Sequence, residues 1–138
     1  MAVSDSINQR FTNQMLGGAT FKLDIEAANE RTVSIQLLDK EGREMQQRAS
    51  LWAYLSSDAN GDALEAVSGT LTIASGTDGI VHLTSAANVA GHSTFMLTSE
   101  ADGDIDVSIT QTSGADTFYL VLVMPDGSRV ISGAITFA

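Results

Sequence analysis

Apolar and polar residues alternate one by one along several stretches of this chain, and that pattern constrains the fold more than any other feature. Residues 105–109 read Ile-Asp-Val-Ser-Ile, and residues 33–37 read Val-Ser-Ile-Gln-Leu. Side chains of a β-strand point alternately to opposite faces of the sheet, so a period of two predicts a strand with one buried side. We therefore expect antiparallel sheets with one face in the core.

Turn sequences separate the expected strands. Asn60-Gly61 and Pro125-Asp126-Gly127-Ser128 are typical of tight turns, because glycine adopts the left-handed conformation and proline presets the first corner. Residues 117–124 (TFYLVLVM) are almost continuously apolar, which predicts a strand buried on both sides. Further strands are expected at residues 21–25, 49–56, 64–67, 71–73, 80–83, 95–97 and 130–137. About seven to nine strands at this spacing predict an all-β fold, either an antiparallel immunoglobulin-like sandwich or a small barrel.

The first 19 residues lack this alternation and are predicted to form a flexible N-terminal arm. Ile7, Phe11 and Met15 are spaced as on one face of a short helix, and Gly17-Gly18 is interpreted as a hinge. A chain of 138 residues has room for one domain with its own core. The expected organisation is an arm, residues 1–19, and a β-sandwich domain, residues 20–138.

Trp52 and Tyr54 alternate with Leu51, Ala53 and Leu55, so the two aromatic residues lie on the opposite strand face from the aliphatic ones. Large aromatic side chains are mostly buried. The favoured interpretation is that Trp52 and Tyr54 form core on the second side of a sheet. The alternative is an exposed, adhesive patch.

Charge is unevenly distributed along the chain, whose net charge is −10. Six of the seven basic residues lie within residues 1–50: Arg10, Lys22, Arg31, Lys40, Arg43 and Arg48. The remainder of the chain has ten acids and one basic residue, Arg129. A surface this acidic repels phosphate backbones, so direct nucleic-acid binding is not expected.

Cysteine is absent, which excludes disulfides and thiolate metal ligands. The first residues, MAVSDSINQR, lack the basic start and apolar centre of a signal peptide. The sequence contains no apolar run of about 18 residues that could cross a membrane. We therefore expect a soluble protein that does not direct its own export and has no membrane partner.

The sequence shows no catalytic motif. His82 lies in the middle of an expected strand and His92 follows a glycine in a loop, and neither has an evident acid or nucleophile partner in the sequence. The nucleophile elbow Gly-x-Ser-x-Gly, the phosphate-binding glycine loops and His-Glu-x-x-His are all missing from the sequence. No enzymatic activity is predicted.

Two trios of polar residues have the spacing of calcium ligands: Asp58, Asn60 and Asp62, and Asp102, Asp104 and Asp106. The first trio departs from a calcium-binding loop, with Ala63 in place of the glycine and Gly69 in place of the glutamate. Acids that cap backbone N–H groups in turns are the commoner explanation. No metal or other cofactor is predicted, and calcium stays an open alternative.

The sequence from residue 31 onward resembles a family of small virion proteins of tailed bacteriophages. The stretches that carry the resemblance are Leu55-Ser-Ser-Asp-Ala-Asn-Gly-Asp62, Gly76-Thr-Asp-Gly79, Leu97-Thr-Ser-Glu-Ala-Asp-Gly-Asp-Ile105, Tyr119-Leu-Val-Leu-Val-Met-Pro-Asp-Gly127 and Ser132-Gly-Ala-Ile-Thr-Phe-Ala138. The resemblance implies an immunoglobulin-like β fold and a role in head decoration, also called capsid cement. These stretches read as turns and closing strands, so no active-site residues follow from them.

As a decoration protein, the chain would be made in the host cytoplasm, assemble as a homo-oligomer on the outer capsid surface and bridge major capsid protein subunits. We expect contacts from an adhesive arm and from basic residues: Arg10, Phe11, Met15, Leu16, Arg31, Arg43 and Arg48. The alternatives are a tail or fibre-associated module and a module that binds carbohydrate on a host surface. An acidic hydrolase built on a β-sandwich ranks below these.

Overall fold

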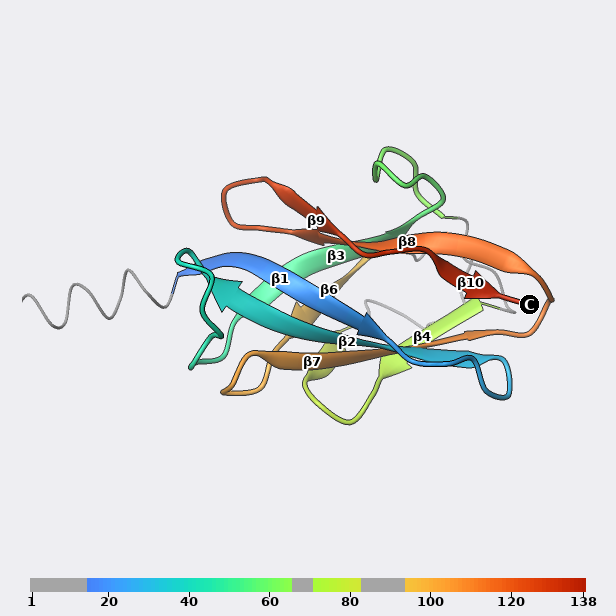
Figure 1. The fold of residues 1–138 in the computed structure, drawn as a ribbon, viewed down its shortest axis with the longest axis horizontal. Coiled ribbons are helices and arrows are strands. Elements are labelled where there is room, and N and C mark those ends of the chain that lie inside the picture. Colours follow the sequence, from blue (N-terminus) through green and yellow to red (C-terminus); the bar gives the residue numbers. More distant parts are fainter. Residues whose placement is uncertain (1–14, 66–70, 83–93) are drawn as a thin grey trace, which may run out of the picture.

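The computed structural model describes residues 15–65, 71–82 and 94–138, which form ten β-strands and no helix (Figure 1). The strands are β1 (Leu16–Leu23), β2 (Glu30–Asp39), β3 (Ser50–Ser56), β4 (Leu71–Ser75), β5 (Ile80–His82), β6 (Thr94–Thr98), β7 (Asp104–Gln111), β8 (Asp116–Val123), β9 (Arg129–Ile131) and β10 (Ile135–Phe137). Most of the alternating stretches of the sequence are therefore strands, as predicted.

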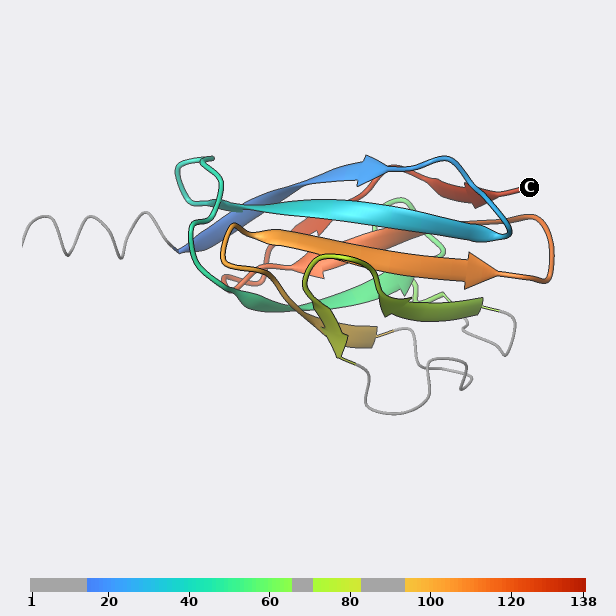
Figure 2. The ribbon, with the colours of Figure 1, turned by 90° about the horizontal axis from the view of Figure 1, so that it is seen from below.

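The strands form two sheets that pack face to face. The four-stranded sheet has the order β1-β2-β7-β4, and the six-stranded sheet has the order β10-β8-β3-β6-β5, with β9 also paired to β8. All of these pairings are antiparallel. Figure 2 shows β1, β2 and β7 running side by side along the long axis of the domain. The predicted antiparallel sandwich is confirmed, and the described strands do not close into a barrel.

The core lies between the two sheets and is built from alternate strand residues. In β7, Ile105, Val107 and Ile109 are fully buried, whereas the polar residues between them lie on the outer face. The rings of Phe118 and Phe137 meet in the core with their centroids 5.7 Å apart. Complete burial of one such apolar side chain contributes about 1.5–3 kcal/mol, and the sum over the core holds the sheets together without disulfides.

The glycine pair at the start of the domain lies in a strand, so the prediction of a hinge there is wrong. The register between β1 and β2 shifts between Leu16 and Gly18, which makes Gly17 the extra residue of a β-bulge. A Cβ atom on Gly17 would lie only 2.7 Å from the Cα atom of Lys40. Glycine is required because two backbones approach closely, not because the chain must bend freely.

The boundary between arm and domain moves accordingly. Residues 16–19 belong to β1, and Leu16 is buried in the core. Residues 1–14 lie outside the described part of the chain. The predicted short helix, which includes Ile7 and Phe11, is therefore not tested. At the other end of the strand, β1 stops at Leu23 and Ile25 is 88% exposed, so the predicted strand of residues 21–25 ends early.

The predicted last strand, residues 130–137, is divided into β9 and β10 at Ser132. The backbone N–H of Leu120 donates to Ser132 Oγ at 3.0 Å, and the backbone N–H of Ser132 donates to the Leu120 carbonyl at 2.9 Å. Ser132 Oγ in turn donates to the Gly133 carbonyl at 2.8 Å. A serine side chain here replaces a backbone acceptor and interrupts the ladder, which period-two reasoning could not predict.

The loop after β3 folds back over the outer face of the six-stranded sheet. A Cβ atom on Gly61 would lie 3.2 Å from Val121 Cγ2, so this loop packs directly on Val121 and buries it. The Tyr54 hydroxyl and Arg129 Nη1 both donate to the Gly61 carbonyl at 2.7 Å. This cover explains why the central part of β8 is buried on both sides. The expected strand at residues 64–67 is only an isolated bridge of Leu64 to Ser56, with residues 66–67 outside the described part.

Candidate functional site

One end of the sandwich gathers several of the residues expected to make contacts. We call it the Met15 end, and define it by Met15, Lys40, Arg43, Arg48 and Pro125. It is the end at which β1 begins, opposite the C-terminus along the long axis (Figure 1). The turns after β2 and β8 lie at this end because both strands finish there, so residues distant in the sequence become neighbours.

A groove of about 600 Å³ opens at the Met15 end. Met15 is 49% exposed and lies at the edge of the groove. The groove is lined by Met15, Leu16, Gly17, Lys40, Pro125 and Asp126. Methionine adapts its shape readily and is enriched in the centres of protein–protein interfaces, so this groove is a candidate contact site.

Asp39, the last residue of β2, holds the turn that follows this strand. The buried Asp39 side chain accepts the backbone N–H groups of Glu41 and Arg43 on Oδ1 at 2.9 and 3.0 Å. Arg43 Nε lies 3.6 Å from Asp39 Oδ2, and Arg43 Nη2 lies 3.2 Å from Glu41 Oε2. Arg48 Nη1 donates to the Ser99 carbonyl at 3.3 Å. Both arginine side chains stay exposed, so their charged groups remain accessible at this end.

The other expected contact residues do not join this group. Leu16 packs mainly in the core and reaches the groove only as part of its lining. Arg31 lies at the opposite end, where Nη1 donates to the Thr136 carbonyl and Nε to the Asp24 carbonyl, both at 3.1 Å. Arg10 and Phe11 lie outside the described residues.

Four residues of the groove were not predicted as contacts: Gly17, Lys40, Pro125 and Asp126. A sequence signal was available for Pro125 and Asp126, because they belong to a recognised tight turn. What it lacked was the strand order that brings the two turns to one end, since turn sequences carry no information about which strands are neighbours.

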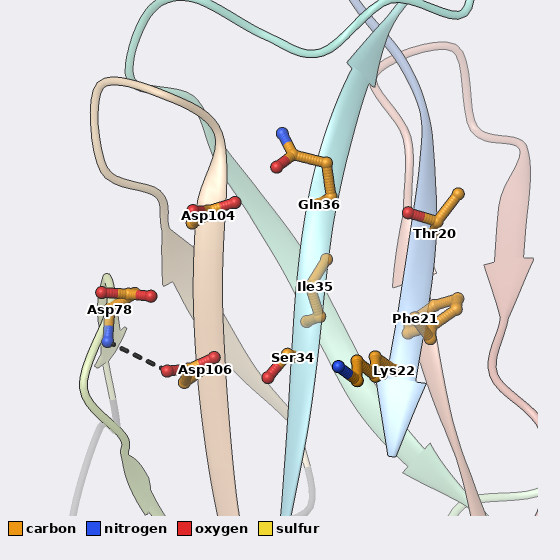
Figure 3. Close-up of a pocket in the computed structure, with 9 residues that line it drawn as sticks. All are labelled: Thr20, Phe21, Lys22, Ser34, Ile35, Gln36, Asp78, Asp104 and Asp106. Carbon is orange, nitrogen blue, oxygen red and sulfur yellow. Dashed lines mark hydrogen bonds between the residues drawn. The ribbon is translucent and has the colours of Figure 1, made fainter. Parts of the chain in front are cut away.

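The outer face of the four-stranded sheet carries polar side chains in rows across the strands (Figure 3). The registers give one row of Thr20, Gln36 and Asp104 and a second of Lys22, Ser34 and Asp106. With Asp78 from the turn before β5, these rows line a shallow hollow of about 320 Å³. The backbone N–H of Asp78 donates to Asp106 Oδ2 at 3.2 Å. The Asp106 carboxylate therefore stabilises the turn before β5.

Carboxylates crowd together where this face meets the Met15 end, and the crowding shifts two pKa values. Partial burial, followed by the charge and hydrogen bond of Asp102, raises the pKa of Asp104 to about 6. A hydrogen bond with Asp78, then burial and the charge of Asp78, raises the pKa of Glu100. Like charges at short range disfavour ionisation and add to both shifts.

In the two acid trios that matched calcium spacing, some side chains accept backbone N–H groups in turns and one forms an ion pair. Asp58 Oδ1 accepts the backbone N–H of Asn60 at 2.7 Å, and Asp62 Oδ1 lies 3.3 Å from Arg129 Nη2. Asp102 Oδ1 accepts the backbone N–H of Asp104 at 3.3 Å. Among the residues that the structure describes, no group of three or more histidine or acid side chains is arranged to hold a metal ion.

His82 lies on the outer face of β5, and its Nε2 is 2.9 Å from Thr98 Oγ1. That partner is a hydroxyl group on the neighbouring strand β6, and such cross-strand contacts are common on the surface of a sheet. His92, the other histidine that the sequence offered as a base, lies outside the described residues.

Trp52 is 50% exposed on the outer face of the six-stranded sheet, so its interpretation as core is wrong. Tyr54 is partly buried beneath the loop that carries Gly61, and its hydroxyl bonds to that loop. The cause is that this sheet has no second layer over Trp52 in the described part of the chain. Periodicity identifies the face of a strand but not what covers it.

With this geometry established, the chain can be compared with known proteins. No protein-family model matches the sequence, and no curated protein matches it. A β-glucuronidase from glycoside hydrolase family 2 is 10% identical with a TM-score of 0.42, over 88% of this chain and 11% of that one. A cohesin module from a Clostridium perfringens family 33 glycoside hydrolase is 14% identical with a TM-score of 0.38, over 88% of this chain and 93% of that module. Both likenesses are distant, and the two-sheet β fold is established by the strand pairing itself.

In the described residues, no helix is long and apolar enough to span a membrane.

Proposed function

We propose that this chain is a structural virion protein that decorates and stabilises a bacteriophage head, and that its Met15 end docks on neighbouring major capsid protein subunits. The family resemblance of its turns and closing strands supports the phage context. The observation that carries the docking site is the half-exposed Met15 beside a groove of about 600 Å³. In this role the protein sits on the outer capsid surface, assembles rather than catalyses and acts as a homo-oligomer.

The construction of the Met15 end suits such a contact. Adhesion through a rigid surface costs less conformational entropy than adhesion through a mobile one. The groove is bounded by β1, which is paired along its length, and by the turn held by Asp39. Met15 as an apolar centre, with the charged residues Lys40 and Asp126 in the groove lining, matches the usual arrangement of an apolar interface core and a polar rim.

The symmetry of a capsid increases the total strength of binding when each single contact is weak. A decoration protein meets many equivalent sites on a shell, and copies joined in an oligomer bind with an avidity far above that of one site. Each Met15 end therefore needs only a small buried area.

The test is a binding assay with purified heads that lack this protein. Met15→Asp places a charge in the groove, and the expected loss of affinity is at least about tenfold, since one apolar contact is removed and one charge must be desolvated. Ile25→Asp is the matched control, because Ile25 is an exposed apolar residue at the opposite end of the sandwich. Cosedimentation measures how many copies bind per head.

Ile25→Asp should bind as the unaltered protein does. Equal binding of the Met15→Asp variant would contradict the docking site.

Mass spectrometry of separated heads and tails tests the location of the protein in the virion, and recovery of the chain only with tails would favour the tail module instead. A deletion of residues 2–14 should also weaken binding while leaving the domain folded, because β1 starts after it.

A further inference from the structure

Trp52 stands on a rigid platform in the exposed face of the six-stranded sheet. It pairs with Met96 of β6 on one side and with Val123 of β8 on the other, and both neighbours are partly buried. Half of the indole remains exposed although burying it would be favourable. The two paired strands fix the backbone of Trp52, and its exposed ring is a flat apolar surface that a flat apolar ligand can cover.

A groove of about 390 Å³ runs beside Trp52, between the start of β3 and the turn that contains Pro125 and Gly127. This volume falls in the range of small-ligand sites. None of the residues that line it in the described part of the chain is ionisable. The lining therefore offers no charged group to pair with an ionic ligand, and it suits a neutral one.

Hydrogen-bonding side chains border the aromatic surface. Ser50 Oγ lies 2.8 Å from Thr98 Oγ1, which in turn lies 2.9 Å from His82 Nε2. Ser50 shares the outer face of β3 with Trp52, and His82 pairs with Met96, the neighbour of Trp52. Ser50 and Thr98 therefore lie one row away from the indole, and His82 lies in the row of Trp52 on the far side of Met96. Each hydroxyl group keeps further hydrogen-bonding capacity because it can donate one bond and accept two, and the imidazole of His82 has a second ring nitrogen.

We propose that this face binds a neutral hexose unit of a polysaccharide, which stacks on Trp52 and hydrogen-bonds to Ser50, Thr98 and His82. A hexose ring has an apolar face of C–H groups and a rim of hydroxyl groups, so it matches an indole bordered by hydroxyl and imidazole groups. A protein segment would also cover the indole, but it would not require the hydroxyl and imidazole groups of Ser50, Thr98 and His82 around it. This function is additional to head docking, and its groove shares Pro125 with the Met15 end.

The single tryptophan of the chain makes the test direct, because its fluorescence reports on this site alone. The full-length protein is titrated with maltoheptaose, cellohexaose, mannohexaose and oligomers of N-acetylglucosamine, with polygalacturonate as an acidic control. A saturable blue shift with at least one neutral oligosaccharide, and none with polygalacturonate, is the expected result. Affinity electrophoresis in gels that contain the corresponding polysaccharide then compares variants.

Trp52→Ala should weaken binding by at least about tenfold, as for an aromatic residue at the centre of a contact. Ser50→Ala should weaken it by several-fold, and Met15→Asp should leave it unchanged. Circular dichroism checks that each variant keeps its β-sheet. The absence of a shift with every neutral oligosaccharide, or undiminished binding by Trp52→Ala, would overturn the proposal. A shift produced only by adding heads would also overturn it and assign the Trp52 face to a protein partner.

Discussion

Replacing Asp104 by asparagine should stabilise the protein at neutral pH, and the gain should vanish in acid. The folded protein raises the pKa of this carboxyl from the ordinary value of 3.8 to about 6, through partial burial and the charge of Asp102. Between these pH values the folded state binds the proton more tightly than the unfolded state. The free energy of unfolding therefore falls as pH rises through this window, and above it the charged form of Asp104 is a net cost.

The magnitude follows from the size of the shift. Two pKa units correspond to about 3 kcal/mol, which is an upper limit because the side chain is only partly buried and solvent screens its charges. After that discount we expect Asp104→Asn to raise the free energy of unfolding by about 0.5–1 kcal/mol at pH 8. At pH 4, where the Asp104 carboxyl of the folded protein is mostly protonated, the variant and the unaltered protein should be nearly equal in stability.

Urea denaturation followed by circular dichroism, at pH 4 and pH 8 and at low and high salt, measures this difference. The stabilisation should shrink in high salt. Asp126→Ala is the contrasting control, since hydrogen bonds from Ser128 lower the pKa of Asp126. Its stability contribution is present above the ordinary pKa and lost as pH falls, so this variant should be destabilised at pH 8. A neutral or destabilising effect of Asp104→Asn at pH 8, or an equal gain at pH 4, would refute the reasoning.

Two further predictions concern the fold. Gly17→Ala should lower the free energy of unfolding by about 1–3 kcal/mol, because the new Cβ would meet the Lys40 backbone; Gly133→Ala, where a Cβ meets nothing within 4 Å, is the control in the same urea assay. Ser132→Ala should cost about 1–3 kcal/mol, since it leaves the buried N–H of Leu120 without its acceptor; a loss below about 0.5 kcal/mol would mean that another group replaces the serine hydroxyl.

The sequence predicted the strands whose environment repeats regularly. Residues 33–37 and 105–109 alternate because one side faces the core and the other faces solvent, and both lie in strands as expected. The turns were predictable for a local reason as well. Gly61 and Gly127 adopt φ values of +74° and +87°, the left-handed conformation that glycine favours.

Features that depend on distant parts of the chain could not be predicted. Gly17 looks like a hinge until the backbone of Lys40 is placed beside it. Ser132 looks like a strand residue until Leu120 donates to its side chain. The exposure of Trp52 depends on which loops cover the six-stranded sheet, and residues near it in the sequence do not determine that.

The candidate site was predicted in part. Met15, Arg43 and Arg48 lie together at one end, but Leu16 belongs to the core and Arg31 to the opposite end. The prediction used residue type, since basic and exposed apolar residues often make contacts. It had no information on strand order, which decides the residues that share an end of a sandwich.

The most direct test of the central claim is a cryo-EM reconstruction of phage heads that carry this chain. The account predicts a sandwich density on the outer capsid surface with its Met15 end against major capsid protein and its C-terminus pointing away. A sandwich bound through the end that carries Ile25 and Ala138, or heads that bear no such density, would contradict it.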